Sequence, residues 1–230
     1  MTKGLTSIIM TCYDQSQTAR HTSMLAAANI TRYTNSDEYE FIIVDCCPKY
    51  PFRDDYKVLK IDDFIVVNPP DIGYYQAMNL GAKEAKGEYL CFIENDVFVQ
   101  EGWLENLRFY LEKGMVDAIM PDQIPCTRQQ QQSYYKYDHA EALGKGATEQ
   151  GLMMIKREAF DKTGGWDPKM KMVYGWKRFY QQIGENGLHL NNTAKVTISH
   201  ITGMTYYDTL ERDPQKHALI SKLEGEYLNG

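Results

Sequence analysis

The stretch Gly81–Val97, GAKEAKGEYLCFIENDV, decides the fold that the sequence predicts. It begins as the last turns of a helix that Gly87 stops, and the apolar run Tyr89–Ile93 then has the length of a buried strand. The polar triplet Glu94–Asp96 follows this strand directly. Ligands of open α/β sheets bind beyond the carboxyl ends of the strands, so an acidic group at this point suits a functional site. A solvated loop that is merely acidic is the alternative interpretation.

Strand-like and helix-like segments alternate on the amino-terminal side of Pro121. This alternation predicts an α/β protein with a doubly wound, mainly parallel sheet flanked by helices. No glycine-rich fingerprint follows the first strand, which disfavours a nicotinamide-binding fold. The predicted strands are Thr6–Cys12, Glu40–Asp45, Lys57–Ile61, Phe64–Val67 and Asp117–Pro121, and the predicted helices are Thr18–Arg32, Gly73–Lys86 and Trp103–Lys113.

The second half of the chain opens with an interruption of this pattern. Residues Gln123–Thr148 read as a long polar and aromatic loop, for which a lid or acceptor-side loop is favoured over an inert insertion. Regular elements then return, and no linker or internal repeat separates them from the first half. We therefore expect one domain over residues 1–205, with the helix of residues 206–230 packed on it. The elements expected here are Gly151–Lys156, Arg157–Thr163, Trp176–Gly184, Ala194–His200 and Leu210–Leu228.

Composition excludes several classes of protein. With 43% hydrophobic and 24% charged residues the chain has the make-up of an ordinary globular protein, and its net charge of −6 argues against general nucleic-acid binding. No apolar run reaches the roughly 18 residues of a membrane helix, and the amino-terminal apolar stretch is too short for a signal peptide. A cytoplasmic location is the resulting expectation. The cysteines lack metal-ligand spacing, which favours buried free thiols.

Polar side chains end four of the predicted strands. They are Thr11, Tyr13 and Asp14 after the first, Asp45 at the second, Glu94, Asn95 and Asp96 after the central one, and His200 at the last. A carboxylate and a neutral imidazole can together hold a divalent cation that keeps positions open for diphosphate oxygens. Such a cation lowers the barrier to loss of a nucleoside diphosphate. The tyrosine offers a face for base stacking, and Asp45 can accept hydrogen bonds from a base or ribose.

The sequence resembles the family-2 glycosyltransferases of the GT-A fold over most of residues 5–205. The resemblance implies metal-assisted, inverting transfer of a sugar from a nucleotide donor, with a UDP-sugar favoured. The segments that carry it occur in the family's order. They are the turn Thr11–Asp14, EFIIVDCCP, AMNLGAKEAKGEYLCFIENDV, IKREAFDKTGGWD and SHITG.

The resemblance also assigns roles to individual residues. It implies that Asp96 and His200 bind Mn²⁺ or Mg²⁺, and that Glu94 touches the ribose or the water shell of the metal. It implies that Asn79 faces the donor sugar or its phosphates. The nucleoside would be bound by Thr11, Tyr13 and Asp45, and Asp14 and Asn95 complete the set of expected donor-side residues.

The chain departs from the family pattern in two places. Cys46 occupies the usual place of a second aspartate, which leaves the base open. Lys177 and Arg178 stand where the family has acidic residues that include its general base, and an arginine cannot take a proton. Asp167 is the first substitute candidate for the base and Glu149 the second.

The residues at this acceptor side carry open alternatives. Lys177 and Arg178 could bind an anionic acceptor or the leaving diphosphate, or could simply begin a surface helix. Trp176 and Trp166 could each stack on a sugar or pack in the core.

Three functional hypotheses follow. The first is an active glycosyltransferase with a nucleotide-sugar donor and a glycan, protein or modified base as acceptor. The second is a GT-A domain that has lost its base and binds a glycan or nucleotide without turnover. The third and weakest is a nucleotidyltransferase, which the missing glycine-rich loop after the first strand disfavours.

Overall fold

The computed structural model describes residues 1–14, 16–35, 37–46, 59, 61–67, 72–125, 151–201 and 214–229, and every structural statement below concerns these residues. The strands are β1 (Thr2–Cys12), β2 (Tyr39–Asp45), β3 (Asp63–Val66), β4 (Gly87–Glu94), β5 (Val97–Phe98), β6 (Ala118–Pro125), β7 (Leu152–Lys156) and β8 (Leu190–His200). The helices are α1 (Gln17–Tyr33), α2 (Tyr74–Glu84), α3 (Trp103–Glu112), α6 (Arg157–Thr163), α7 (Gly175–Glu185) and α9 (Pro214–Asn229).

The strands form one mixed sheet in the order β3-β2-β1-β4-β7-β6-β8-β5. The pairs β2–β3, β1–β2, β1–β4 and β6–β8 are parallel, whereas β4–β7, β6–β7 and β5–β8 are antiparallel. This confirms the predicted α/β class with a mainly parallel, mixed sheet. The parallel strands β1, β2 and β4 lie side by side, so their carboxyl ends open at the same edge.

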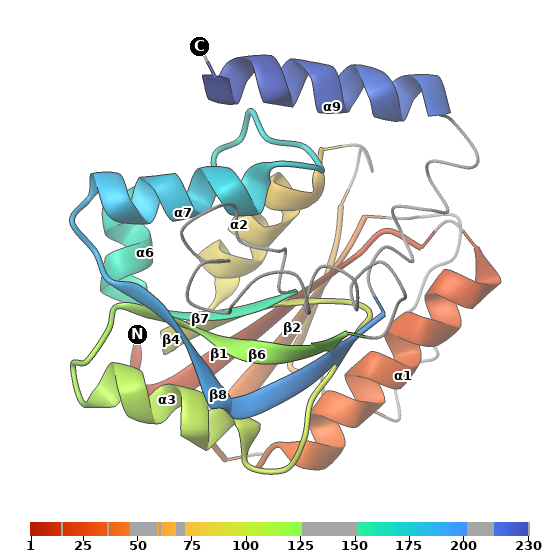
Figure 1. The fold of residues 1–230 in the computed structure, drawn as a ribbon. Coiled ribbons are helices and arrows are strands. Elements are labelled where there is room, and N and C mark those ends of the chain that lie inside the picture. The colour runs from red at the N-terminus through yellow and green to blue at the C-terminus, as the bar shows by residue number, and fades with distance from the viewer. Residues whose placement is uncertain are drawn as a thin grey trace.

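Both faces of the sheet are covered by helices, which explains why the central strands read as continuous apolar runs. Ile8 and Met10 pack in one core with α1 and α3, and Ile9 lies in the other core with α2, α6 and α7. The two layers of helices are seen on opposite sides of the sheet in Figure 1. Every residue of β2 is buried, as expected for a strand covered on both faces.

Arg157 joins α2 to the sheet. Its guanidinium donates to the carbonyl oxygens of Ala82 and Ala85 at 2.9 Å, and to that of Gly87 at 3.2 Å. The Ala82 and Ala85 carbonyls lie at the end of α2, where the last carbonyls of a helix have no helical partner. The Gly87 carbonyl lies at the start of β4. Hydrogen bonds from a charged donor contribute about 1.5–3 kcal/mol each. The family-like segment IKREAF therefore has a structural role in holding β4.

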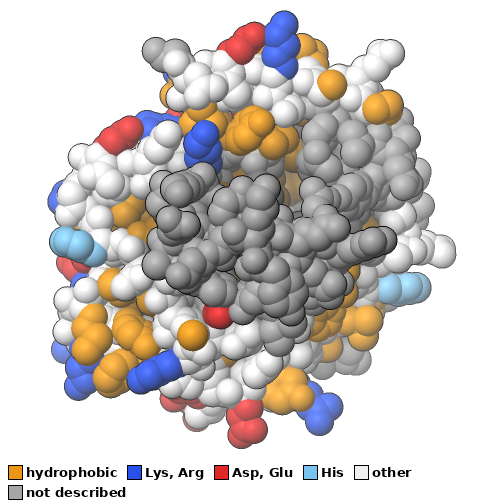
Figure 2. Space-filling model, in the orientation of Figure 1, with side chains coloured by type: hydrophobic (Ala, Val, Ile, Leu, Met, Phe, Trp, Pro, Cys, Tyr) orange, Lys and Arg blue, Asp and Glu red, His pale blue; other side chains and the backbone are white. Residues whose placement is uncertain are grey.

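The helix α9 lies on the outer side of α7, away from the sheet (Figure 1). Its leucines Leu219 and Leu223 are exposed, and Figure 2 shows hydrophobic side chains among charged ones along the edge where α9 lies. Glu224 is the buried residue of this helix. Within the described ranges, no helix is both long enough and apolar enough to span a membrane. The expected domain boundary at residue 205 lies outside the described residues.

Several element boundaries differ from the sequence prediction. The two-residue strand β5 was not predicted, and β8 begins at Leu190 rather than Ala194. The helix α2 ends at Glu84, and Gly87 opens β4 instead of stopping the helix. The strand β6 extends to Pro125, beyond the expected end at Pro121, because its second half pairs with β8 after a register shift. Leu59 and Ile61 of the predicted strand Lys57–Ile61 are described and are not in a strand, while its other residues and most of the predicted loop Gln123–Thr148 lie outside the described residues.

Candidate functional site

The short strand β5 brings the end of β4 to the end of β8. The chain turns after Glu94, and Val97 of β5 then pairs with His200 of β8 in an antiparallel ladder. The backbone N–H of Ile201 donates to the carbonyl oxygen of Asp96 at 3.1 Å, which fixes the turn against β8. Two segments that are distant in sequence thus meet through backbone pairing.

Glu94, Asp96 and His200 converge at this junction. The His200 Nε2 atom lies 3.0 Å from Glu94 Oε2 and 3.1 Å from Asp96 Oδ1. One ligand-type atom from each of the three lies within 4.8 Å of the others. The His200 and Asp96 side chains are buried, and Glu94 is partly buried. We call these three residues the triad.

Gly151 makes room for the triad at the start of β7. It has φ of 65°, and a Cβ atom there would lie 2.9 Å from the His200 ring and 2.7 Å from Val97 Cγ2. Its carbonyl oxygen also accepts the backbone N–H of Glu94 at 2.7 Å. Any side chain at residue 151 would therefore displace the imidazole or strain the backbone.

The electrostatics of the triad favour a protonated imidazole in the metal-free protein. Burial disfavours the charged form of His200, but the hydrogen bonds and charges of Asp96 and Glu94 outweigh it and raise the pKa of His200 to about 10. Burial likewise disfavours the Glu94 carboxylate, yet hydrogen bonds from His200 and Trp176 and the His200 charge hold its pKa below the ordinary value. These pKa shifts favour a positively charged imidazole between two carboxylates.

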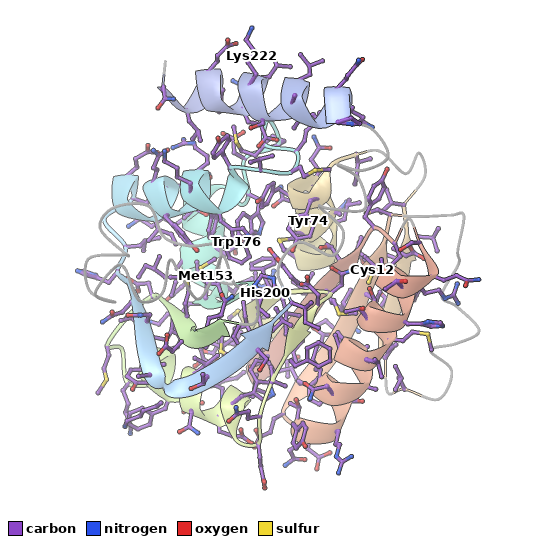
Figure 3. The ribbon with its side chains drawn as sticks, turned by 45° about the vertical axis from the view of Figure 1, so that its right-hand side comes forward. Cys12, Tyr74, Met153, Trp176, His200 and Lys222 are labelled. Carbon is purple, nitrogen blue, oxygen red and sulfur yellow. The ribbon has the colours of Figure 1, made fainter. Side chains whose placement is uncertain are left out.

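Two aromatic side chains border the triad. The Trp176 indole Nε1–H donates to Glu94 Oε1 at 2.9 Å, while His200 faces the other oxygen of the same carboxylate. Burial raises the pKa of the Tyr74 phenol well above the ordinary value, and the negative charge of Glu94 raises it further. Figure 3 shows Tyr74, Trp176 and His200 gathered in the same region of the molecule.

The chemistry of the triad fits a divalent cation. It offers two carboxylates and one imidazole, a set of oxygen and nitrogen donors that suits Mn²⁺ and also accommodates Mg²⁺. The atoms already converge on one point, where the imidazole proton now offsets the carboxylate charge. A cation could replace that proton without a rearrangement of the backbone.

A second polar group lies at the neighbouring ends of β1 and β2. The Asn95 side-chain amide donates to Asp14 Oδ1 at 3.0 Å and to Ser23 Oγ at 2.7 Å, and Ser23 donates to Asp14 Oδ1 at 2.8 Å. Asp45 pairs in register with Cys12 across β1 and β2. Burial, opposed by the Ser23 hydrogen bond and reinforced by the charge of Asp45, raises the pKa of Asp14 to about 7. Three predicted donor-side residues, Asp14, Asp45 and Asn95, are thus brought together.

The remaining residues predicted on the donor side are placed as follows. Thr11 is buried at the end of β1, in register with Glu94, and Tyr13 is partly buried against the core. Asn79 lies on α2, where its amide donates to the Trp166 carbonyl at 2.8 Å and its oxygen accepts the Trp166 backbone N–H at 2.9 Å. Both polar ends of Asn79 are thereby engaged, and its contact with the donor stays a prediction.

Trp166 and Trp176 lie in the core cluster between α2, α6 and α7, and each is only 1% exposed. Trp166 stacks on Phe179 at 4.2 Å between ring centroids and meets Trp176 edge-on at 4.9 Å. Both tryptophans therefore pack in the core, which was one of the two alternatives for them beside stacking on a sugar. Trp176 in addition reaches Glu94.

The start of α7 presents no carboxylate to the triad. Lys177 is exposed, and Arg178 forms ion pairs with Asp167 at 3.4 Å and Glu185 at 2.8 Å. Asp167 also accepts from the Tyr227 hydroxyl at 2.9 Å and from the Lys169 backbone N–H at 2.9 Å. The candidate base is therefore held in a network toward α9. Glu149, the second candidate, lies outside the described residues.

Sequence reasoning missed four residues of this region: Tyr74, Gly151, Ser23 and Glu224. Tyr74 and Ser23 occupy unremarkable places in predicted helices, and no local signal marks them. Gly151 is the first residue of the predicted strand Gly151–Lys156, and a glycine at the start of a strand is ordinary. The free cysteines predicted to be buried are buried at Cys12, Cys46 and Cys91, and Cys47 and Cys126 lie outside the described residues.

The model of the family described as glycosyl transferase family 2 matches residues 7–181, most of the chain. The chain belongs to glycosyl transferase family 2. Its fold is also similar to two solved structures of GT-A glycosyltransferases, which confirms the GT-A type of sheet for this family 2 member. No curated protein matches the sequence.

The two solved structures are longer than this family 2 chain. The crystal structure of GalNAc-T7 with UDP, GalNAc and Mn²⁺ aligns with a TM-score of 0.65 and 17% identity, over 85% of this chain and 43% of that one. The crystal structure of S. aureus TarS 1-349 aligns with a TM-score of 0.68 and 13% identity, over 95% of this chain and 65% of that one. At these identities the likeness concerns the fold.

Proposed function

We propose that the protein transfers a sugar from a nucleoside diphosphate donor to an acceptor hydroxyl, with the help of Mn²⁺ or Mg²⁺ and with inversion at the anomeric carbon. The observation that carries this proposal is the convergence of Glu94, Asp96 and His200 beyond the ends of β4 and β8. Membership of glycosyl transferase family 2 supports the reaction class. The similar crystal structure of GalNAc-T7 contains UDP and Mn²⁺, which makes a UDP-sugar the first donor to test.

In this proposal Asp96 and His200 hold the cation, and Glu94 either completes the site or binds through water. A bound divalent cation would supply positive charge beside the leaving diphosphate. The chain's own part is to orient these groups. Trp176 and His200 each engage one oxygen of Glu94, so the carboxylate cannot rotate, and His200 must release its proton when the cation enters.

The nucleoside would lie across the ends of β1 and β2. Tyr13 would offer its ring to the base, and Thr11 and Asp45 would bind base or ribose groups. Asp14 and Asn95 form the floor of this region through their hydrogen bond, and Asn79 would approach the donor from α2. In this proposal the diphosphate would lie between the end of β1 and the triad, and the register pairing of Thr11 with Glu94 supports this position.

On the acceptor side a general base would accept the proton of the acceptor hydroxyl as the hydroxyl oxygen attacks the anomeric carbon from the face opposite the diphosphate. Asp167 is the first candidate and Glu149 the second. Lys177 and Arg178 would attract an anionic acceptor. The acceptor class, whether a glycan, a protein or a modified base, is set by residues on this side.

A second candidate function is a GT-A domain that binds a glycan or nucleotide without turnover. The specific observation in its favour is the start of α7, where an exposed lysine, Lys177, and an ion-paired arginine, Arg178, stand in place of the family's acidic residues, and an arginine cannot act as a base. This function predicts binding of a nucleotide with Mn²⁺ and no release of free sugar.

The test is a panel of nucleotide sugars incubated with the protein and Mn²⁺, with hydrolysis followed by release of nucleoside diphosphate. We expect slow hydrolysis of one donor and a decrease of at least about 100-fold in Asp96→Asn, because the variant lacks one cation ligand. Asp37→Asn, the same change at an exposed position, is the matched control. Binding without hydrolysis would favour the second function, and neither binding nor hydrolysis across the panel would overturn both.

A further inference from the structure

The helix α9 buries a carboxylate while two of its three leucines are exposed. Glu224 is only 3% exposed, whereas Leu219 and Leu223 are 57% and 55% exposed, and Leu228 packs against the core. A charged side chain at a buried position departs from the usual amphipathic pattern, in which the apolar side chains face the protein. A buried carboxylate is costly unless hydrogen bonds replace its hydration, so its partners indicate what the helix is built to hold.

Four consecutive backbone N–H groups donate to the Glu224 carboxylate. Oε1 accepts from Lys171 at 2.6 Å and Met172 at 2.8 Å, and Oε2 accepts from Val173 at 2.9 Å and Tyr174 at 2.8 Å. Bonds of this kind to an ionised acceptor are about twice as strong as neutral ones. The carboxylate also lies at the amino-terminal end of α7, where the helix dipole favours negative charge.

The segment Lys171–Tyr174 is connected to the triad at both ends. At its start, the Lys171 carbonyl oxygen accepts the backbone N–H of Tyr74 at 2.8 Å, and Tyr74 lies in the same region as His200 and Trp176 (Figure 3). At its end the chain enters α7, whose second residue, Trp176, donates to Glu94. Both aromatic neighbours of the triad are therefore attached to the segment that Glu224 fixes.

The start of α7 is packed closely against α2, so a shift of one segment displaces the other. Gly175 lies against the ring of Tyr75, so closely that a Cβ atom at residue 175 would overlap it. The Tyr75 hydroxyl in turn donates to the Met172 carbonyl oxygen at 3.4 Å. A shift of the 171–174 backbone would consequently move α7, and with it the Trp176 indole, relative to Glu94.

We infer that Glu224 is a positioning residue for the candidate metal and donor site. From the last helix of the chain it fixes the Lys171–Tyr174 segment, and through this segment it holds the Trp176 indole against Glu94. The inference rests on the proposed function for its effect on metal binding, whereas its effect on Trp176 is a property of the metal-free protein.

The first test observes Trp176 in the full chain without metal. The protein contains three tryptophans, so ¹⁹F NMR of 5-fluorotryptophan protein gives three resonances that single Trp→Phe variants assign. We expect Glu224→Gln to shift or broaden the Trp176 resonance and to leave the Trp103 resonance in place. A glutamine keeps one acceptor oxygen and turns an N–H₂ group toward backbone donors. Glu226→Gln, an exposed change on the same helix, should alter neither resonance.

The second test measures the affinity for Mn²⁺ alone by electron paramagnetic resonance. Glu224→Gln should weaken binding about tenfold, as loss of an outer-shell support does. In a Trp176→Phe background the same substitution should have no further effect, because the path through the indole is already broken. Glu224→Asp keeps the negative charge on a side chain that is one methylene shorter. It should remain folded and weaken Mn²⁺ binding less than Glu224→Gln does.

The outcomes separate the inference from the proposed function. An unchanged Trp176 resonance in both Glu224 variants, with only a lower thermal midpoint, would show a purely structural role and overturn the inference. An equal loss of Mn²⁺ affinity with and without Trp176 would overturn the proposed path. If the wild-type protein bound no Mn²⁺, the proposed metal site would fail, while the ¹⁹F result would still decide the role of Glu224.

Discussion

The two sides of the candidate site balance their charges in different ways. On the strand-end side, Glu94 and Asp96 share a single imidazole, and Asp45 helps to raise the pKa of the neighbouring Asp14. On the helix-start side, Arg178 pairs with two carboxylates. Each of these cations faces two carboxylates, but the triad is largely buried, whereas Glu185 is 58% exposed and its charge is screened by solvent. The negative charge that a bound cation would relieve therefore lies on the strand-end side.

This contrast shows why the sequence can depart from its family at the start of α7 while the triad is retained. Strand ends are fixed by backbone pairing, so the donor side keeps its geometry. The start of α7 is fixed by side-chain packing and by Glu224, so Lys177 and Arg178 can stand in the family's acidic positions while the helix retains its position. Four predictions from this contrast are given in order of decreasing effect, and a fifth, the most direct test of the metal site, closes the Discussion.

The largest effect is expected at Asp14, on the strand-end side. Its folded pKa of about 7 lies above the ordinary value of 3.8, so the folded state binds the proton more tightly and Asp14 costs stability as the pH rises from 3.8 to 7. Asp14→Asn should raise the free energy of unfolding at pH 8 by up to about 4 kcal/mol and have little effect near pH 4. Denaturant titrations at both pH values measure it, with Asp37→Asn as control. A gain that did not depend on pH would contradict the assignment.

The affinity for Mn²⁺ should rise with pH by about tenfold per unit between pH 6.5 and 8.5. The reason is that the pKa of His200 is about 10, so each cation must displace a proton over this whole range. Titration calorimetry in buffers with different heats of ionisation should detect about one proton released at pH 7.5. An affinity independent of pH would mean that Mn²⁺ does not displace a proton from His200.

Trp176→Phe should weaken Mn²⁺ binding about tenfold while the protein remains folded. The phenyl ring retains most of the buried apolar contact, but it lacks the indole N–H that engages Glu94. Lys177→Gln, at the next and exposed position, is the matched control and should change the affinity less than twofold. Equal effects of the two substitutions would remove the distinction between the inward and outward faces of α7.

Arg178→Gln should have the smallest effect, a decrease of at most about 1 kcal/mol in the free energy of unfolding. Glu185 is 58% exposed, so solvent screens its ion pair with Arg178, and the pair with Asp167 is long at 3.4 Å. A double-mutant cycle with Glu185→Gln should give a coupling below that value, with no change in Mn²⁺ affinity. A coupling of several kcal/mol would show that the network does more than balance charge.

Much of the fold and part of the site could be predicted from the sequence. Apolar runs such as Tyr89–Ile93 identify strands because both faces of the sheet are covered, and polar residues directly after them mark the strand ends. The resemblance brought Asp96 and His200 together correctly. The pairing of β5 with β8, which joins the end of β4 to His200, could not be predicted, because β5 has only two residues and therefore no periodicity.

Contacts that depend on side-chain direction were beyond the sequence. The face of α7 that Trp176 occupies depends on the residue at which the helix begins, and patterns leave such boundaries open. Asn79 stands at a family position, yet its amide binds the Trp166 backbone. Glu224 reads as one more charged residue of an amphipathic helix, and only the fold shows the four N–H groups around it.

The most direct test of the central claim is electron spin echo spectroscopy of Mn²⁺ bound to the protein, because a coordinated imidazole modulates the echo through its ¹⁴N nucleus. The wild-type protein should bind one Mn²⁺ and show this modulation, and His200→Gln should lose it together with at least about 100-fold in affinity. A spectrum without nitrogen modulation, or Mn²⁺ bound equally well by His200→Gln, would contradict a cation held by Asp96 and His200.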